Sequence, residues 1–207
     1  MILERVEIVG FRGINRLSLM LEQNNVLIGE NAWGKSSLLD ALTLLLSPES
    51  DLYHFERDDF WFPPGDINGR EHHLHIILTF RESLPGRHRV RRYRPLEACW
   101  TPCTDGYHRI FYRLEGESAE DGSVMTLRSF LDKDGHPIDV EDINDQARHL
   151  VRLMWKSPRA SSISSPVSYP HIRKISLMGR FVRDFPQWYS CLSIISLSRG
   201  PDRRDIV

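Results

Sequence analysis

The chain has 207 residues, of which 41% are hydrophobic and 27% charged, and its formal net charge is −1. This composition is typical of a globular protein, and the near-zero net charge argues neither for nor against nucleic acid binding. Three cysteines provide no disulfide framework, and no apolar run approaches the ~20 residues of a membrane span. We therefore expect a cytoplasmic protein without membrane partners.

Charge is distributed unevenly along the chain. Residues 155–207 contain nine Lys and Arg against three Asp and Glu, a net charge of +6, whereas residues 1–154 carry −7. Eleven of the last 53 residues are serine. We expect one folded unit over residues 1–154 and a Ser/Arg-rich tail over 155–207 that is poorly ordered or non-native.

The first 28 residues predict three strands. Residues 2–9 alternate apolar and charged side chains, residues 10–13 suggest a turn, and residues 17–21 alternate again. The apolar run Val26–Ile28 follows as a short buried strand. A hairpin thus precedes the third strand, an order that differs from nucleotide kinases and small GTPases, where the phosphate loop usually follows the first strand.

The next stretch matches the phosphate-binding pattern G-x-x-x-x-G-K-[ST] at every fixed position. It lies between the predicted strand and leucines at helical spacing, which is the context that the motif requires. The alternative is an ordinary turn before a leucine-rich helix. The candidate nucleotide-binding residues are Gly29, Glu30, Asn31, Ala32, Trp33, Gly34, Lys35, Ser36 and Ser37.

The motif predicts a site for ATP and Mg²⁺. A helix that begins near Gly34 presents unpaired backbone N–H groups and the positive end of its dipole to a phosphate. Lys35 is expected to reach the β- and γ-phosphates, and the Ser36 hydroxyl is expected to help hold Mg²⁺.

A helix is predicted at residues 35–46 and is expected to end before Pro48. The polar clusters that follow it are expected to have structural roles and not to bind metal. Asp58 and Asp59 are expected to cap a loop rather than to bind metal. Residues 73–80 alternate as a strand, so His73 and His75 share an exposed face and are not expected to bind zinc.

The most basic run is Arg87–Arg94. Interpreted as a strand, it places Arg87, Arg89 and Arg91 on one side, where they can contact a DNA phosphate backbone. A solvated edge strand has the same pattern. Cys99 and Cys103 follow without a second cysteine pair, so we expect no metal site there.

Residues 108–114 and 125–131 predict two further strands. Asp139 is expected to cap a helix whose apolar face is Ile143, Ala147, Leu150, Val151 and Met154. Residues 190–198 alternate weakly, and we expect no element of the tail to join the folded unit.

Three segments together resemble a known family. They are Ile8–Ile14 with its Phe-Arg-Gly turn, Val26–Leu39 with the phosphate loop, and Asp58–Phe60. The combination resembles the N-terminal ATPase head of OLD-family ATP-dependent endonucleases, relatives of the RecF, Rad50 and SMC heads. The resemblance covers about residues 1–154 and implies an α/β fold with α+β character, namely part of a P-loop ABC-type ATPase head with an antiparallel β subdomain.

The resemblance also implies roles for residues and partners. Arg12 would lie near the nucleotide phosphates, and Asn31 would shape the loop, while Ala32 and Trp33 replace the small residues common in this branch. ATP, Mg²⁺ and DNA would be ligands, and a homodimer is one possible assembly because the signature motif comes from a facing subunit.

Several parts of such an ATPase have no match in these residues. We find no apolar strand ending in Asp-Glu (Walker B), no signature motif and no metal-binding carboxylates of a Toprim nuclease domain. We therefore expect a truncated ATPase head with an unrelated tail, in which ATP binding persists and hydrolysis is impaired. The alternative is a non-catalytic interaction or regulatory fragment; a self-contained nucleotide kinase is disfavoured by the strand-rich middle.

Overall fold

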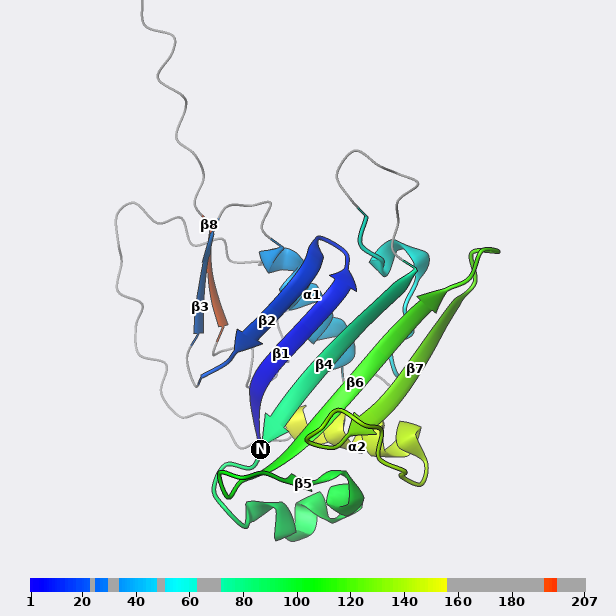
Figure 1. Cartoon of the computed structure of the whole chain (residues 1–207). Coiled ribbons are helices and arrows are strands. Elements are labelled where there is room, and N and C mark those ends of the chain that lie inside the picture. The colour runs from blue at the N-terminus through cyan, green and yellow to red at the C-terminus, as the bar shows by residue number, and fades with distance from the viewer. Residues whose placement is uncertain (23–24, 30–33, 48–50, 63–71, 156–191, 197–207) are drawn as a thin grey trace, which may run out of the picture.

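The computed structural model describes residues 1–22, 25–29, 34–47, 51–62, 72–155 and 192–196. Within these residues the fold is mixed α/β and centred on an antiparallel sheet. Its strand order is β2 (Ile14–Met20), β1 (Ile2–Phe11), β4 (His73–Arg81) and β6 (His108–Ser118), and both β7 (Val124–Leu131) and β5 (Thr101–Pro102) pair with β6. Figure 1 shows this sheet in the middle of the molecule, with helices α1 and α2 behind it. The predicted fold class is confirmed.

The first two strands form the predicted hairpin. Strand β1 (Ile2–Phe11) pairs with β2 (Ile14–Met20), and Phe11 faces Ile14 across the turn. Arg12 occupies this turn with a φ of 46°, in the left-handed region that non-glycine residues seldom adopt. The strand therefore extends two residues beyond its predicted end, and the turn contains only Arg12 and Gly13.

Alternating hydrophobicity sets the register of the central strands. They are β4 (His73–Arg81), β6 (His108–Ser118) and β7 (Val124–Leu131), all at the predicted places. The inward side chains of β4 are Leu74, Ile76, Leu78 and Phe80, each with no exposed surface. These residues face the helices, because a strand directs alternate side chains to opposite faces of its sheet.

Helix α1 (Lys35–Leu45) follows strand β3 (Asn25–Gly29), which confirms the predicted order of strand and helix. Its apolar side is buried in the core through Leu38, Leu42 and Leu45. A second helix, α2 (Ile143–Trp155), buries Ala147 and Leu150 of its predicted apolar face. None of the helices in the described residues is long and apolar enough to cross a membrane.

The prediction that Arg87–Arg94 is a strand is wrong. This segment forms the short 3₁₀ helices η2 (Arg87–Arg89) and η3 (Arg91–Cys99), before the two-residue strand β5 (Thr101–Pro102). Two features explain the difference: Pro95 has no backbone N–H for a sheet ladder, and the carboxylate of Glu82 accepts the His88 backbone N–H. Arg87, Arg89 and Arg91 therefore do not share one side of a strand.

Two further predictions are wrong: the residue that caps α2, and the separation of the tail from the folded unit. Asp142, and not Asp139, caps α2: its Oδ1 accepts the backbone N–H of Asp145 at 3.1 Å. In the predicted tail, β8 (Leu192–Ser196) pairs in parallel with β3, from Asn25 opposite Leu192 to Gly29 opposite Ser196. An element of the tail thus does join the phosphate-loop strand.

Candidate phosphate-binding site at the start of helix α1

The candidate site begins where β3 ends. Gly29 is the last residue of β3, and Gly34 is the residue before the first turn of α1. The predicted loop residues between them, Glu30, Asn31, Ala32 and Trp33, lie outside the described residues. The structure therefore fixes both ends of the motif, and these ends have the strand-and-helix arrangement that a phosphate loop requires.

Gly34 has a backbone conformation suited to glycine. Its φ is 73°, in the left-handed region, and a Cβ at this position would lie 2.8 Å from Ile14 Cγ1. The helix has no side-chain hydrogen bond at its N-cap and no acidic residue in its first turn. The sequence thus begins this helix without the Ser, Thr, Asp or Asn cap that usually satisfies its first N–H groups.

The first turn of α1 contains the three polar residues of the motif. Lys35 is 9% exposed, an unusual degree of burial for a lysine, while Ser36 is exposed. The Ser37 hydroxyl oxygen accepts the backbone N–H of Gly13 at 3.3 Å. The turn between β1 and β2 is therefore fastened to the start of α1.

Arg12 lies in that same turn and pairs with two carboxylates. Its Nε donates to Asp59 Oδ1 at 2.8 Å, and its Nη1 donates to Asp40 Oδ2, on α1, at 2.9 Å. Burial lowers the pKa of Arg12, but these interactions, led by that with Asp59, outweigh it and raise the pKa. The permanently charged guanidinium thus links the hairpin, α1 and the segment around residue 59.

Asp59 serves as a structural anchor, as the loop-capping interpretation predicted. Its side chain is 2% exposed, and its Oδ2 accepts the Tyr53 hydroxyl at 2.6 Å and the Glu56 backbone N–H at 2.9 Å. The bond from Glu56 is half of a capping box at the short helix η1 (Arg57–Asp59), in which the Glu56 side chain accepts the Asp59 backbone N–H in return. Asp59 is fully engaged by Arg12, Tyr53 and Glu56, whereas Asp58 is exposed.

The other polar candidates lie away from this site. Strand β1 connects the two ends of the sheet: Val9 pairs with His75 near the Arg12 turn, and Ile2 pairs with Arg81 at the far end. Arg87, Arg89 and Arg91 follow β4 at the far end, and all three are exposed. They are accessible to a ligand there, although without the strand geometry that was predicted.

The histidine and cysteine candidates have separate partners. His73 is exposed, and its Nε2 lies 3.6 Å from Glu115 Oε1. His73 therefore lies on the outer face of the sheet, as predicted. The Cys99 thiol is buried and donates to Gln146, and burial raises its pKa to about 12. Cys103 instead donates to the Thr101 carbonyl oxygen. The two thiols do not form a shared site.

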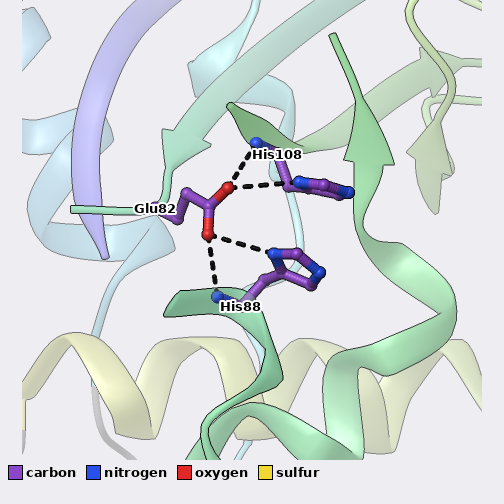
Figure 2. A group of neighbouring side chains, drawn as sticks. All are labelled: Glu82, His88 and His108. Atoms are coloured by element: carbon purple, nitrogen blue, oxygen red, sulfur yellow. Dashed lines mark hydrogen bonds and ion pairs between the residues drawn. The ribbon is translucent and has the colours of Figure 1, made fainter. Parts of the chain in front are cut away.

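Sequence reasoning missed a polar cluster at the far end of the sheet. Glu82 has no exposed surface, and each of its carboxylate oxygens accepts one backbone and one imidazole N–H, from His88 and from His108. Figure 2 shows both rings turned toward the carboxylate. Burial raises the pKa of Glu82, but these hydrogen bonds outweigh it and lower the pKa to about 2. No sequence pattern indicated it, because Glu82 lies 6 and 26 residues from its partners.

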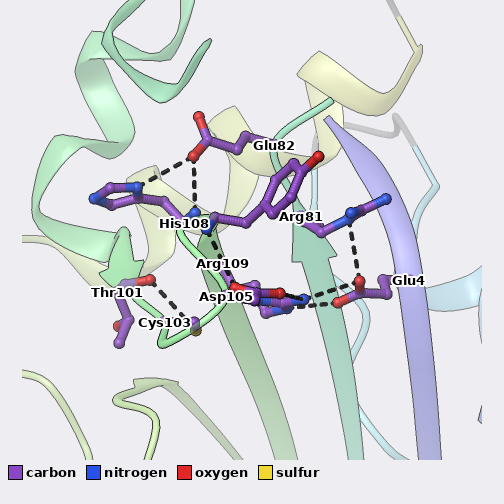
Figure 3. A network of polar contacts seen from close by, with 9 residues as sticks. Glu4, Arg81, Glu82, Thr101, Cys103, Asp105, His108 and Arg109 are labelled. Carbon is purple, nitrogen blue, oxygen red and sulfur yellow. Dashed lines mark hydrogen bonds and ion pairs between the residues drawn. The ribbon is translucent and has the colours of Figure 1, made fainter. Parts of the chain in front are cut away.

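An ion-pair network lies beside this cluster. Glu4 of β1 accepts from Arg109 at 2.6 Å and pairs with Arg81 at 3.1 Å, and Arg109 also donates to Asp105. Figure 3 shows these side chains next to Glu82 and His108. The far end of the sheet is therefore held by charged contacts, whereas the end near α1 is held by Arg12 and its two carboxylates.

Comparison with known proteins places residues 1–157 in a family described as protein of unknown function (DUF2813), and the chain belongs to that family. A solved chain from work on ATP-driven dimerization and DNA-stimulated activation of SMC ATPases is similar, with 16% identity, a TM-score of 0.39, and coverage of 70% of this chain and 78% of that chain. The SMC head bound to the C-winged helix domain of ScpA is also similar, with 17% identity and a TM-score of 0.38. That match covers 70% of this chain and 40% of the other chain. Similarity this low supports no inference about this chain's ligands.

Proposed function

We propose that this member of the DUF2813 family binds the phosphates of ATP, with Mg²⁺, through the loop from Gly29 to Ser37. The observation that carries the proposal is the start of α1, where a left-handed Gly34 precedes a buried Lys35 and no side-chain hydrogen bond caps the helix. Backbone N–H groups and the helix dipole favour an anion at such a position. A lysine in the first turn of a helix places its charge against the dipole, and a bound phosphate would offset this charge.

The donor set at this position fits a nucleotide triphosphate. Lys35 would contact the β- and γ-phosphates, and the exposed Ser36 hydroxyl would contribute one ligand to Mg²⁺. The metal ion would neutralise phosphate charge. Arg12 would lie near the phosphates, and its two carboxylate partners, Asp40 and Asp59, would hold its orientation.

We further propose that the chain is the N-terminal portion of an OLD-family ATP-dependent DNA endonuclease, with an ABC-type ATPase head. The support is the sequence resemblance together with the fastening of the Phe-Arg-Gly turn to the phosphate-loop helix through Ser37. Hydrolysis by these 207 residues would be impaired, because their sequence contains no apolar run followed by Asp-Glu. Assembly as a homodimer would be needed for a facing subunit to complete the nucleotide site.

The test is nucleotide affinity measured by calorimetric titration of the chain with Mg²⁺-ATP and with a non-hydrolysable analogue. Lys35→Ala removes a charged hydrogen-bond donor to phosphate and should weaken binding by about 1.5–3 kcal/mol, or roughly 10- to 150-fold. The matched control is Lys133→Ala, because Lys133 is an exposed lysine in the turn after β7. That variant should bind as tightly as the wild type.

The outcomes separate the proposal from the alternative function. Equal affinities of the Lys35→Ala variant and the wild type would exclude the phosphate-loop assignment. Absence of any nucleotide binding, together with co-purification of a second protein, would favour a non-catalytic interaction or regulatory fragment. Brisk steady-state ATP turnover by the wild type would contradict the impaired-hydrolysis part alone.

A further inference from the structure

Three side chains with metal-ligating atoms meet at the far end of the sheet. Glu82 follows β4, His88 lies in η2, and His108 begins β6. Each can offer one ligand atom, and these atoms lie within 4.8 Å of one another. In the described part of the chain, this is the one group of three such residues close enough to share an ion.

The geometry points to a binding site for a divalent transition metal ion of the zinc class, held by Glu82, His88 and His108. Two histidines and one glutamate are the protein ligands of open zinc sites, in which water takes the fourth position. This donor set contains no thiolate and one carboxylate, so it suits Zn²⁺, Co²⁺ or Ni²⁺ and does not favour Cu(I). The site is separate from the proposed Mg²⁺-nucleotide site at the other end of β1.

The potential ligand atoms already lie about as close together as the ligands of one metal ion. The Nδ1 atoms of His88 and His108 lie 3.0 and 3.1 Å from the two carboxylate oxygens of Glu82. In a tetrahedral zinc site with bonds of about 2.0–2.1 Å, adjacent ligand atoms are about 3.3 Å apart. The protein has therefore already brought the three groups together, and an ion would require side-chain rotation rather than a change of fold.

When an ion binds, the backbone hydrogen bonds of the cluster would remain and its imidazole hydrogen bonds would be replaced. The backbone N–H groups of His88 and His108 donate to Glu82 at 2.9 and 2.8 Å, so they continue to orient the carboxylate. Each oxygen has a second lone pair, which now accepts an imidazole N–H and would then be available to the metal. Each metal-bound imidazole would carry its proton on Nε2 and none on Nδ1, which leaves the Nδ1 lone pair for the ion.

Binding of an ion would require both rings to move. They are stacked with centroids 3.6 Å apart and an angle of 26° between their planes, so both must tilt before their lone pairs converge on one ion. The side chains of His88 and His108 are 14% and 26% exposed, whereas Glu82 is fully buried. An ion would therefore enter from the histidine side, where water also reaches the rings.

The test titrates the metal-free chain with Zn²⁺ alone, by calorimetry, and with Co²⁺, whose visible absorption reports coordination. One ion per chain should bind. His88→Asn and His108→Asn, which alter partly exposed side chains, should each weaken Zn²⁺ binding by at least about tenfold, since even outer-shell changes cost 10–100-fold. Circular dichroism of both variants establishes that they are folded.

The chain supplies a matched control in another pair of neighbouring histidines. The rings of His73 and His75 have centroids 5.6 Å apart on the outer face of the sheet, and His73→Asn/His75→Asn should leave Zn²⁺ affinity unchanged. Nuclear magnetic resonance of the wild type provides a readout without substitution: Zn²⁺ should shift the imidazole nitrogens of His88 and His108 and remove their Nδ1 protons.

Three results would overturn the metal site. They are no binding of Zn²⁺ by the folded wild type, equal affinity of the wild type and both single variants, and loss of binding in the control variant. In each case Glu82, His88 and His108 form a hydrogen-bonded clamp only. Nucleotide binding does not enter any of these measurements, so failure of the metal site leaves the proposed function untouched.

Discussion

Gly34 combines two constraints that separate substitutions can distinguish. Its left-handed φ disfavours any side chain, and the space for a Cβ is already occupied by Ile14 at 2.8 Å. The second constraint comes from Ile14, the first residue of β2, which packs against the start of α1. The glycine of the motif is therefore needed for packing as well as for the approach of a phosphate.

Gly34→Ala should lower the free energy of unfolding by about 2–4 kcal/mol, from backbone strain of about 1–2 kcal/mol and overpacking of a similar size. Urea-induced unfolding measures the change. The control is Gly106→Ala, because Gly106 has a φ of 81° and a Cβ there would have no neighbour within 4 Å, so strain alone applies. Equal losses in the two variants would show that the contact with Ile14 does not matter.

Helix α2 illustrates how a nearby residue can mislead a sequence-based assignment. Both Asp139 and Asp142 precede its apolar face, and the first was the predicted cap. The chain instead turns at Asp142, which has a φ of 45° and accepts the Asp145 backbone N–H. Aspartate is one of the few residues that tolerate the left-handed region, so Asp142 can end the turn and begin the helix.

Asp142→Ala should therefore destabilise the protein by about 1 kcal/mol, through loss of the cap, and somewhat more through the strained backbone. Thermal unfolding followed by circular dichroism is a suitable measurement. Asp139→Ala, a change of the same chemistry three positions earlier, should alter stability by less than about 0.5 kcal/mol. The reverse order of effects would restore Asp139 as the cap.

Alternation predicted the strands that bury one face, but it also predicted a strand where none forms. Residues 2–9, 73–80 and 108–114 alternate clearly because each strand buries one face, and that local pattern fixes its register. The segment 87–94 alternates as well, but its arginines are solvated and its conformation is decided by Pro95 and by the distant Glu82. A local pattern contains no information about such a contact.

The candidate phosphate site was predictable to a greater extent than the Glu82 cluster. A contiguous motif specifies Gly29, Gly34 and Lys35, and their placement at the ends of β3 and α1 follows from it. The contacts of Arg12 with Asp40 and Asp59 were not predictable, because both partners are distant in sequence. The fold brings Arg12 and these two carboxylates together, and the spacing of residues in the sequence does not indicate the contact.

At the scale of the whole molecule, the buried Glu82 carboxylate couples stability to acid. Its pKa is about 2 in the folded protein and 4.5 in the unfolded reference, so the unfolded chain binds a proton more readily. The stabilisation is therefore fully present above pH 4.5 and is lost as the pH falls from 4.5 toward 2.

Unfolding midpoints in urea, measured across this pH range, should decline more steeply for the wild type than for Glu82→Gln. The variant should also be less stable at pH 7, because a neutral amide replaces a carboxylate that accepts four N–H donors. Parallel declines for the two proteins would mean that other carboxylates control the acid response.

The exposed arginines allow a test of DNA binding at the surface of the protein. Arg87, Arg89 and Arg91 were proposed to contact DNA phosphates, and their exposure in η2 and η3 keeps them accessible. Changing all three to Ala should weaken binding to duplex DNA and reduce the slope of log affinity against log salt by up to about 3. Fluorescence anisotropy at several salt concentrations measures both quantities.

A control variant separates this local effect from net charge. Arg16, Lys133 and Arg152 are exposed elsewhere on the molecule, and replacing them with Ala removes the same amount of charge. This variant should retain the affinity and salt dependence of the wild type. If both triple variants lose affinity equally, the DNA contact is non-specific attraction to the whole protein.

The pairing of β3 with β8 has a consequence for the order in which the protein forms during synthesis. Strand β1 and all its neighbours in the large sheet are translated by residue 131, but Asn25 pairs with Leu192, near the other terminus. At about 5–20 residues per second, β8 is synthesised roughly 10–30 s after the hairpin of β1 and β2. The strand that leads into the phosphate loop must therefore wait, without this neighbour, until residues 192–196 have been translated.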